Sequence, residues 1–252
     1  MTVTTKIKNR YSLKVTSLIL FLCVWQFASI WIDVDLLPSP ARVALSIHEH
    51  LFAGDLLSSV AITLARVGVS FFIAMAFGVA VGVLMGRNRN WDAALDGLLI
   101  LSLNLPALVV IILCYLWFGL GEFAAVLAVS INKFPIVVVN MREGAKAVDM
   151  DLLQVTQAFK VSPYRTFFKV YLPQLYPYLL ASARSGLALV WKIVLVVELL
   201  GRSDGVGFKL GIYFQFFDIT SILAYSFAFI FVVMIIELLV IAPLDRRLME
   251  WR

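Results

Sequence analysis

The residues of this sequence with a possible chemical role are ionisable side chains that lie inside long apolar segments. Lys133, Lys192, Glu198 and Glu237 each lie in a run of otherwise apolar residues. A charge in such surroundings is costly unless it is paired or faces a polar cavity, so each of these residues indicates either an ion pair or a polar path. From the residues alone both interpretations stay open.

The sequence offers no arrangement typical of catalysis or metal binding. His48 and His50 lie two positions apart, so they do not share a helix face, and no third metal ligand is near them in sequence. Cys23 and Cys114 both fall inside apolar runs and form neither a disulfide framework nor a metal-ligand spacing. No GxxxxGK(S/T) phosphate loop is present, so the chain cannot bind ATP by that route. We therefore expect no enzymatic activity, no cofactor and no metal.

The overall composition is that of a membrane protein. Of the 252 residues, 62% are hydrophobic and 15% are charged, and the mean hydropathy is +0.95. A soluble domain is about 45–50% apolar and about 25% charged, so this chain has too little polar surface to live in water. The net charge of +5 would suggest a nucleic acid partner in a soluble chain. Here we interpret it through topology, and we expect a lipid bilayer and no nucleic acid.

Six apolar runs predict six transmembrane helices. They cover residues 13–32, 62–85, 98–118, 123–139, 179–200 and 222–242. Most are close to the ~20 residues that a helix needs to cross the hydrocarbon core, and they are too long for strands. The predicted fold class is therefore all-α and polytopic. We expect a single domain, residues 1–252, because no linker, low-complexity region or repeat divides the chain.

The segment between the first two runs, LPSPARVALSIHEHLFAGDLL, predicts a short helix on the outer surface. Pro40 suits the first turn of this helix and Gly54 suits its end. His48 and His50 are then expected on a solvated face.

Lysine and arginine residues outside the apolar runs are divided unequally between the two sides. One side carries only Arg42, Arg202 and Lys209. The other side carries Lys6, Lys8, Arg10, Lys14, Arg87, Arg89, Arg142, Lys146, Lys160, Arg165, Lys169, Arg246, Arg247 and Arg252. Since cytoplasmic loops carry an excess of basic residues, the richer side is predicted to be cytoplasmic, and both termini lie on it.

A polar segment between the fourth and fifth runs, LLQVTQAFKVSPYRTFFKVYLPQLYP (152–177), then lies in the cytoplasm. It predicts two short helices, the second capped by Ser162 with Pro163 in its first turn and broken by Pro173. The two helices carry the aromatic residues Phe159, Tyr164, Phe167 and Phe168. Two interpretations are open: a knob that docks a cytoplasmic partner, or an amphipathic loop that lies among lipid headgroups.

This segment resembles the cytoplasmic coupling loop of permease subunits in binding-protein-dependent ABC importers. That family's pattern is Glu-Ala-Ala, three residues, Gly, nine residues and Ile-x-Leu-Pro. The spacing is intact here, but Gln154, Val155 and Thr156 replace Glu-Ala-Ala and Lys160 replaces the glycine. If Lys160 takes a left-handed conformation, the cost is about 1–2 kcal/mol. Otherwise the bend moves toward Ser162 and Pro163.

Further segments extend the resemblance to the nitrate, taurine and alkanesulfonate branch, from about residue 36 onward. They are LLPSPARV, GVLMGRNRNWDAALDGLL, LWFGLGE, REGAKAVDMDLL and ELLGRSDGVGF. The resemblance implies a type I importer of the bacterial inner membrane. In such an importer two permease subunits form the path and a periplasmic binding protein delivers the solute. Separate ATPase subunits bind ATP and Mg and dock on the coupling loops.

The resemblance places the coupling loop at about residues 141–177. The residues expected to contact the ATPase are Gln154, Val155, Thr156, Ala158, Phe159, Lys160, Tyr164, Phe167, Leu172 and Pro173. The expected function is that of the transmembrane importer subunit for a small anion such as a sulfonate, taurine or nitrate, with a homodimer favoured over a heterodimer. The alternatives are a secondary transporter, or an importer permease for a non-anionic or aromatic solute.

The residues expected along the path are Asn104, Pro106, Lys133, Trp191, Lys192 and Glu198. Lys133 lies about 15 Å from the outer start of its run, and Lys192 lies about 20 Å from the cytoplasmic start of its run. Both lysines thus fall near mid-depth, where a positive potential suits an anion.

Structural roles are the alternative for each of these residues. Either lysine could pair with Glu198 or Glu237, or contact carbonyl groups at a kink. Asn104-Leu105-Pro106 could mark a gate or only a packing kink. Arg66 and Arg184, near the span ends, are expected to extend toward the membrane surface.

Overall fold

Every element of the structure is helical. The computed structural model describes residues 3–32, 37–241 and 243. The elements are α1 (Val3–Trp31), α2 (Pro40–Phe52), α3 (Leu56–Arg87), α4 (Arg89–Asn104), α5 (Ala107–Phe118), α6 (Glu122–Lys146), α7 (Met150–Ala158), α8 (Pro163–Thr166), the π-helical turn η1 (Phe167–Tyr171), α9 (Leu172–Gly201), α10 (Val206–Gln215), α11 (Ile219–Ile236) and the π-helical turn η2 (Glu237–Ile241). The predicted all-α class is confirmed.

Helices occupy the six predicted runs, but within the described residues only four of them, or five if a bent pair is one span, are long and apolar enough to cross a membrane. Four described segments are long and apolar enough to cross a membrane: Leu56–Arg87, Glu122–Lys146, Pro163–Gly201 and Ile219–Leu239. The pair α4 and α5 qualifies only when taken together, because the two helices are bent by 97°. The first run corresponds to a shorter apolar helix, Thr16–Trp31.

The third predicted span, residues 98–118, is therefore broken rather than continuous. Leu105 has an extended backbone with φ −69° and ψ 124°, as expected for a residue that precedes proline. Pro106 then supplies no N–H to continue the helix. The Asn104 side chain donates to the Ile100 carbonyl oxygen at 2.8 Å and so satisfies one carbonyl of the interrupted helix.

The centre of the fold is the packing of α3 against α6, with α9 alongside. Gly78, Gly82 and Gly86, spaced four residues apart, put one face of α3 directly against α6. A Cβ atom on Gly82 would lie 2.7 Å from the Met141 Cβ, so only glycine permits this approach. Small residues at such spacing are what allows membrane helices to pack closely, since apolar burial alone does not drive their association in lipid.

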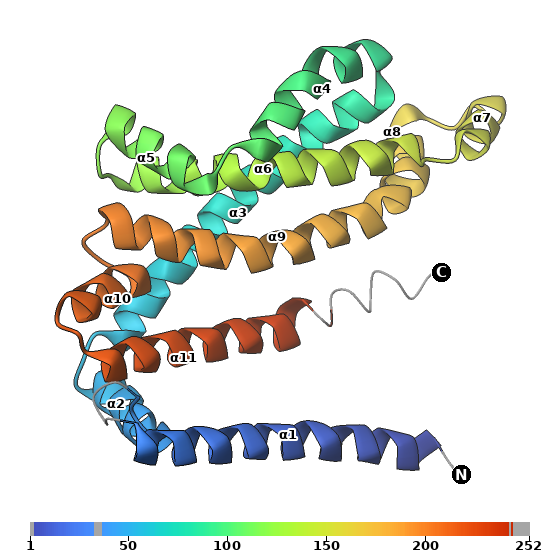
Figure 1. Ribbon diagram of the computed structural model, residues 1–252. Coiled ribbons are helices and arrows are strands. Elements are labelled where there is room, and N and C mark those ends of the chain that lie inside the picture. The colour runs from blue at the N-terminus through green and yellow to red at the C-terminus, as the bar shows by residue number, and fades with distance from the viewer. Residues whose placement is uncertain (1–2, 33–36, 242, 244–252) are drawn as a thin grey trace.

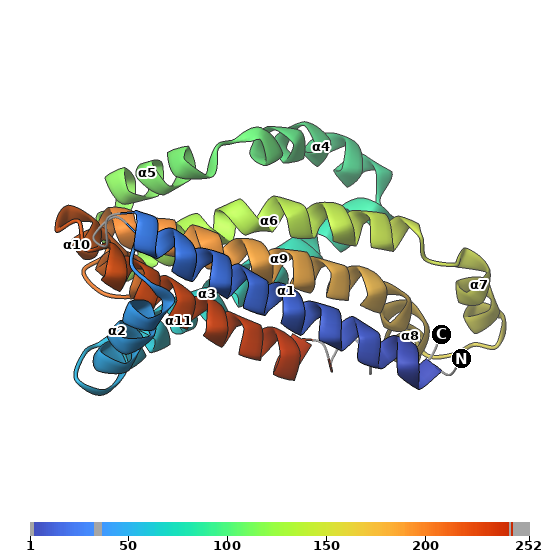
Figure 2. The ribbon, with the colours of Figure 1, turned by 60° about the horizontal axis from the view of Figure 1, so that its bottom comes forward.

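The long helices run between two ends of the molecule that carry different elements. α2, α5 and α10 lie at one end, while α7 and α8 lie at the other (Figure 1). Viewed after rotation, α1 begins at the end that carries α7, and α11 runs toward that end (Figure 2). In the predicted topology the end with α7 is the cytoplasmic one.

The second coupling helix differs from the prediction, because Pro173 does not break it. The segment Pro163–Gly201 is one helical segment of 39 residues. It passes through η1, where the Leu172 N–H donates to the Phe167 carbonyl oxygen five residues back. This wider π-turn precedes Pro173, and the Gln174 side chain donates to the Val170 carbonyl oxygen at 2.9 Å. A π-bulge and a side-chain donor of this kind let a helix continue through proline.

The short helix predicted between the first two runs is confirmed as α2. Ser39 caps it by accepting a hydrogen bond from the Arg42 N–H at 3.3 Å, and Pro40 is its first residue. The expectation of a solvated face holds for His48, which is exposed, but is wrong for His50. His50 is half-buried, with its Nε2 atom 3.2 Å from the Ser221 Oγ atom. Among the described residues no group of three potential metal ligands occurs.

Candidate functional site

The coupling loop is a compact turn between two capped helices. Asp149 caps α7 by accepting hydrogen bonds from the backbone N–H groups of Asp151 at 2.8 Å and Leu152 at 3.3 Å. At its other end the Val161 N–H donates to the Thr156 carbonyl oxygen at 2.9 Å. The chain therefore reverses within a few residues, in a helix-ending arrangement that needs one left-handed residue.

Lys160 supplies the left-handed residue, with φ at 50°. The bend is thus kept at the position where the family pattern has glycine, and it does not move to Ser162 and Pro163. A lysine there costs about 1–2 kcal/mol relative to a relaxed backbone. Ser162 starts the next helix by accepting a hydrogen bond from the Arg165 N–H at 3.4 Å.

A set of apolar side chains around this turn is exposed, and we call it the coupling surface. Phe159 is 80% exposed and Tyr164 is 73% exposed, which is unusual for large aromatic groups. The coupling surface consists of Leu152, Val155, Phe159, Tyr164, Phe167 and Phe168. Such a patch, carried on a rigid helical turn, has the character of a protein-docking surface.

The remaining predicted coupling residues are distributed around this surface. Gln154, Ala158 and Lys160 are exposed beside it, while Leu172 and Pro173 are half-buried at its base. Thr156 is a correction: it is buried, and its hydroxyl donates to the Leu153 carbonyl oxygen at 2.7 Å. It supports the turn from inside and presents nothing to a partner.

Lys133 is also a correction, because it does not face a path in this structure. Its side chain is completely buried, and Nζ donates to the Ser182 carbonyl oxygen of α9 at 2.9 Å. A Cβ atom on Gly186 would lie 1.8 Å from the Lys133 Nζ, so the glycine provides the space that the lysine occupies. The structural alternative, contact with a carbonyl group, describes Lys133.

Glu198 is buried as well and belongs to an ion network between α3, α6 and α9. It is 0% exposed, and its Oε1 atom accepts a hydrogen bond from Arg66 Nη1 at 2.7 Å. Its Oε2 atom accepts from the Thr63 hydroxyl at 2.9 Å and from the Gly207 N–H at 2.8 Å. In this structure Glu198 therefore pairs with Arg66 and with neither lysine.

Arg66 is the centre of this network and does not extend to the membrane surface as expected. It is 5% exposed and bonds three carboxylates, those of Glu198, Glu122 and Asp204. Arg202 joins the group by donating to Glu122 Oε1 at 2.8 Å. The five charges come from α3, α6, α9 and the loop after α9, so the network fixes the outer ends of these elements to one another.

The loop that follows α9 is shaped to fit against Glu198. Gly205 has φ at 98°, a conformation that favours glycine. A Cβ atom on Gly207 would lie 2.2 Å from the Leu195 carbonyl oxygen, so this residue must also be small. The Val206 N–H donates to the Thr63 hydroxyl at 2.9 Å. The motif ELLGRSDGVGF thus forms a loop closed over its own glutamate.

Trp191 and the residues at the broken span have different surroundings. Trp191 is buried and packs edge-on against Phe229, with ring centroids 5.9 Å apart, so its predicted position on the path is not seen. Asn104 and Pro106 are exposed at the 97° bend between α4 and α5. Glu237 pairs with Arg184 at 3.5 Å, and not with Lys133 or Lys192 as the structural alternative suggested.

Lys192 is the predicted path residue that lies exposed in the middle of a span. It makes no ion pair with another residue of the described chain. The exposed positions Ala181, Ser185, Ala188 and Val196 share its helix face, so a stripe of small and polar residues runs along α9. An unpaired charge on such a stripe is expected to face a polar cavity and not lipid.

Sequence reasoning missed the network residues Thr63, Arg66, Glu122 and Asp204. The available signal was Arg66 itself, an arginine four residues inside the second apolar run. Combined with the unpaired Glu198 at the same side of the membrane, it could have suggested an interhelical pair.

The fold and these surfaces define a polytopic helical membrane protein with a docking surface at one end and a charged residue exposed within a span. The family model of the binding-protein-dependent transport system inner membrane component matches residues 53–246, and the chain belongs to this family. Its structure is also similar to that of the MetNI methionine ABC transporter in inward-facing conformations. That match has a TM-score of 0.66 and 19% identity, and it covers 77% of this chain and 95% of the other, which establishes likeness of fold.

Several named permease proteins are similar to most of the chain. The taurine transport system permease protein TauC of Escherichia coli (strain K12) is 27% identical over 252 residues, covering 97% of this chain and 91% of TauC. SsuC of Bacillus subtilis (strain 168), whose name refers to aliphatic sulfonate transport, is 28% identical over 221 residues, covering 88% of this chain and 80% of SsuC. The nitrate import permease protein NrtB of Synechocystis is 29% identical over 146 residues, covering 58% of this chain and 53% of NrtB.

The buried network generates a prediction about stability. Replacing Arg66 by Met leaves the Glu198 carboxylate buried without a cation, and breaking a buried pair in this way costs about 3–5 kcal/mol. We expect Arg66→Met to lower the thermal unfolding midpoint of the detergent-purified protein strongly. Arg42→Met, at an exposed position of α2, is the matched control. Equal stability of the two variants would show that the network is not needed to hold the helices together.

Proposed function

We propose that this chain is the path-forming membrane subunit of an ATP-driven importer that receives its solute from a periplasmic binding protein. The observation that carries the proposal is the helical segment Pro163–Gly201. Its first turns bear Tyr164, Phe167 and Phe168 of the coupling surface, and its middle bears Lys192 on an exposed face. One segment thus connects a docking surface to a charged position inside the membrane.

ATP hydrolysis is assigned to a separate cytoplasmic subunit. The chain has no phosphate loop of its own, so ATP and Mg are bound by that partner. The coupling surface fits the need for a docking site because its aromatic side chains are exposed on a turn that is capped on both sides. Buried aromatic anchors contribute much of the binding energy at protein interfaces.

The solute is proposed to be a small organic or inorganic oxyanion. Lys192 supports this, since an exposed cation at mid-span attracts anions into a path of low dielectric constant. The names of TauC, SsuC and NrtB refer to taurine, aliphatic sulfonates and nitrate, which are all oxyanions or carry one. A second copy of the chain, facing the stripe of α9 that carries Lys192, would enclose this path.

The proposed orientation places α7 in the cytoplasm and α2 outside. In a Cys23→Ser background, which removes the exposed native thiol, Lys160→Cys should react with a membrane-impermeant thiol reagent only from the cytoplasmic side. Glu49→Cys, exposed on α2, should react only from the outside. Labelling in intact spheroplasts and in inverted vesicles measures this, and the reverse pattern would invert the proposed topology.

The coupling surface is tested by Phe159→Asp. Because Phe159 is 80% exposed, the variant should insert and fold normally. A charge buried in an apolar socket costs several kcal/mol of association, so the ATPase subunit should no longer co-purify. Trp91→Asp is a matched control, an exposed aromatic residue on α4 outside the coupling surface. ATPase retained at the wild-type level by Phe159→Asp would contradict the assigned docking site.

The charge at Lys192 is tested by Lys192→Met in proteoliposomes with the ATPase and the loaded binding protein. We expect uptake that requires internal ATP in the wild type, and uptake at least about ten-fold slower in Lys192→Met, which is about 1.4 kcal/mol of lost stabilisation. Co-purification of tagged and untagged copies verifies assembly of the proposed homodimer. Undiminished anion uptake by the variant rules out a required charge, and wild-type uptake driven by an ion gradient alone rules out the importer.

A further inference from the structure

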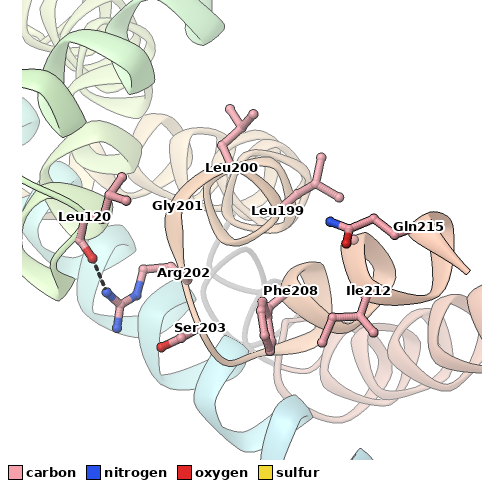
Figure 3. A pocket seen from close by; sticks show the side chains of 10 residues that line it. Leu120, Leu199, Leu200, Gly201, Arg202, Ser203, Phe208, Ile212 and Gln215 are labelled. Carbon is pink, nitrogen blue, oxygen red and sulfur yellow. Dashed lines mark hydrogen bonds between the residues drawn. The ribbon is translucent and has the colours of Figure 1, made fainter.

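A pocket lies at the outer end of α9, between this helix end and α10 (Figure 3). Its volume is about 360 Å³, within the range of about 300–1,000 Å³ that is typical of small-molecule sites. Residues from the end of α9, the loop that follows it, α10 and the turn before α6 line the pocket: Leu120, Leu199, Leu200, Gly201, Arg202, Ser203, Phe208, Gly211, Ile212 and Gln215.

The pocket lies in line with the exposed stripe of α9. Leu199 lines it and lies seven residues after Lys192, two helical turns farther along, so the two side chains share one face of the helix. The rise between them is about 10 Å. Val196, also exposed, lies between them. A solute that entered from the outer end would therefore pass from this pocket to the proposed path without leaving the same face.

The lining of the pocket is polar at its ends and apolar in between. Ser203 and Gln215 lie on opposite sides, with Phe208 and Ile212 between them (Figure 3). Ser203 and Gln215 make no side-chain hydrogen bond to another residue of the described chain, so their hydroxyl and amide groups are available to a ligand.

Arg202, by contrast, has two of its three guanidinium nitrogens engaged. Its Nη1 atom donates to the Leu120 carbonyl oxygen at 2.6 Å, and Nη2 donates to Glu122, while the buried Nε atom makes no hydrogen bond within the described chain. The bidentate face of the guanidinium group is therefore not free to hold a bare inorganic anion. Neutral hydrogen-bonding groups beside an apolar wall suit a molecule that has an oxyanion head and a hydrocarbon chain.

We propose that this pocket is the entrance site of the path and that it takes a small organosulfonate in preference to nitrate. The sulfonate oxygens accept hydrogen bonds from Ser203 or Gln215, and the chain packs against Leu199, Phe208 and Ile212. The proposal rests on the proposed function, because the organosulfonate class includes solutes named for its relatives. It adds to that function the place where the solute first contacts the permease, and a preference for organosulfonates over nitrate.

Gly211 permits a test that fills the pocket without straining the backbone. A Cβ atom at this position would meet only Leu199 atoms, the nearest at 3.5 Å, which is ordinary contact. Gly211→Leu should therefore fold normally and occupy the space of the ligand chain. Gly68→Leu is the matched control, because Gly68 is also helical and a Cβ atom there has nothing within 4 Å.

The readout is protection of a thiol in the pocket, which requires neither ATP nor the binding protein. In the assembled importer with Cys23→Ser, Ser203→Cys is labelled by a thiol reagent in the presence of butane-1-sulfonate or nitrate at equal concentration. We expect butane-1-sulfonate to slow labelling at least about five-fold and nitrate to leave it unchanged, since an apolar chain contributes binding that nitrate lacks. Gly211→Leu should abolish this protection, and Gly68→Leu should preserve it. Glu49→Cys should be unprotected.

Three results would overturn the pocket assignment: no protection by butane-1-sulfonate, equal protection by nitrate, or protection that survives Gly211→Leu. Loss of co-purification of tagged and untagged copies in Gly211→Leu would also overturn it, because the pocket would then be filled by the second copy. The uptake assay described above reports separately on the proposed function. Protection without ATP-driven uptake would contradict the proposed importer function and support the pocket as a binding site. ATP-driven uptake without protection would support the importer function and contradict the pocket assignment.

Discussion

A buried charge inside a membrane needs a polar or oppositely charged partner within the protein, and this constraint organises one half of the molecule. Arg66 lies in α3, is 5% exposed, and is satisfied by carboxylates from α6, α9 and the following loop. Removing this arginine would leave the buried Glu198 carboxylate without its cation. The three central helices are consequently tied together at the same depth, and the loop of residues 202–207 is fixed to them.

Other contacts complete what the network begins. At the opposite end Arg142 bonds Asp92 and Asp96, which holds α4 against α6. Between the two ends, the glycine face of α3 and the Lys133 contact with α9 exclude lipid from the centre. Arg66 and Arg142 are paired and Lys133 is buried against a carbonyl group, whereas Lys192 is exposed and makes no ion pair within the described chain. This difference supports a functional role for Lys192.

Local signals in the sequence predicted local features well. The apolar runs located the long helices, Pro40 located the start of α2, and the spacing of the coupling pattern marked Lys160 as one of two places where the bend could fall. Each of these depends on residues close together in the chain. Pro173 misled for the same reason: proline normally ends a helix, but a π-turn just upstream accommodates it, and nothing in the local pattern distinguishes the two outcomes.

The site was less predictable because its partners come from distant segments. Arg66 and Glu198 are 132 residues apart, and no periodicity within either helix indicates that they face each other. Depth alone made Lys133, Lys192 and Glu198 look alike. These three residues differ in which helix covers the face of the span that carries them. For Lys133, the missing side chain of Gly186 leaves the space that the buried lysine occupies.

The helical segment Pro163–Gly201 also constrains which insertions and deletions the protein tolerates. Each residue of an α-helix advances the chain by about 1.5 Å and turns it by about 100°. Deleting or inserting one residue anywhere between η1 and Glu198 would therefore rotate the carboxylate away from Arg66, even if no contact residue were altered. A single substitution along this stretch leaves the rotational position of Glu198 unchanged, whereas a change of length alters it. Among proteins that share this architecture, the number of residues separating the coupling turn from the buried glutamate should consequently vary far less than their identities.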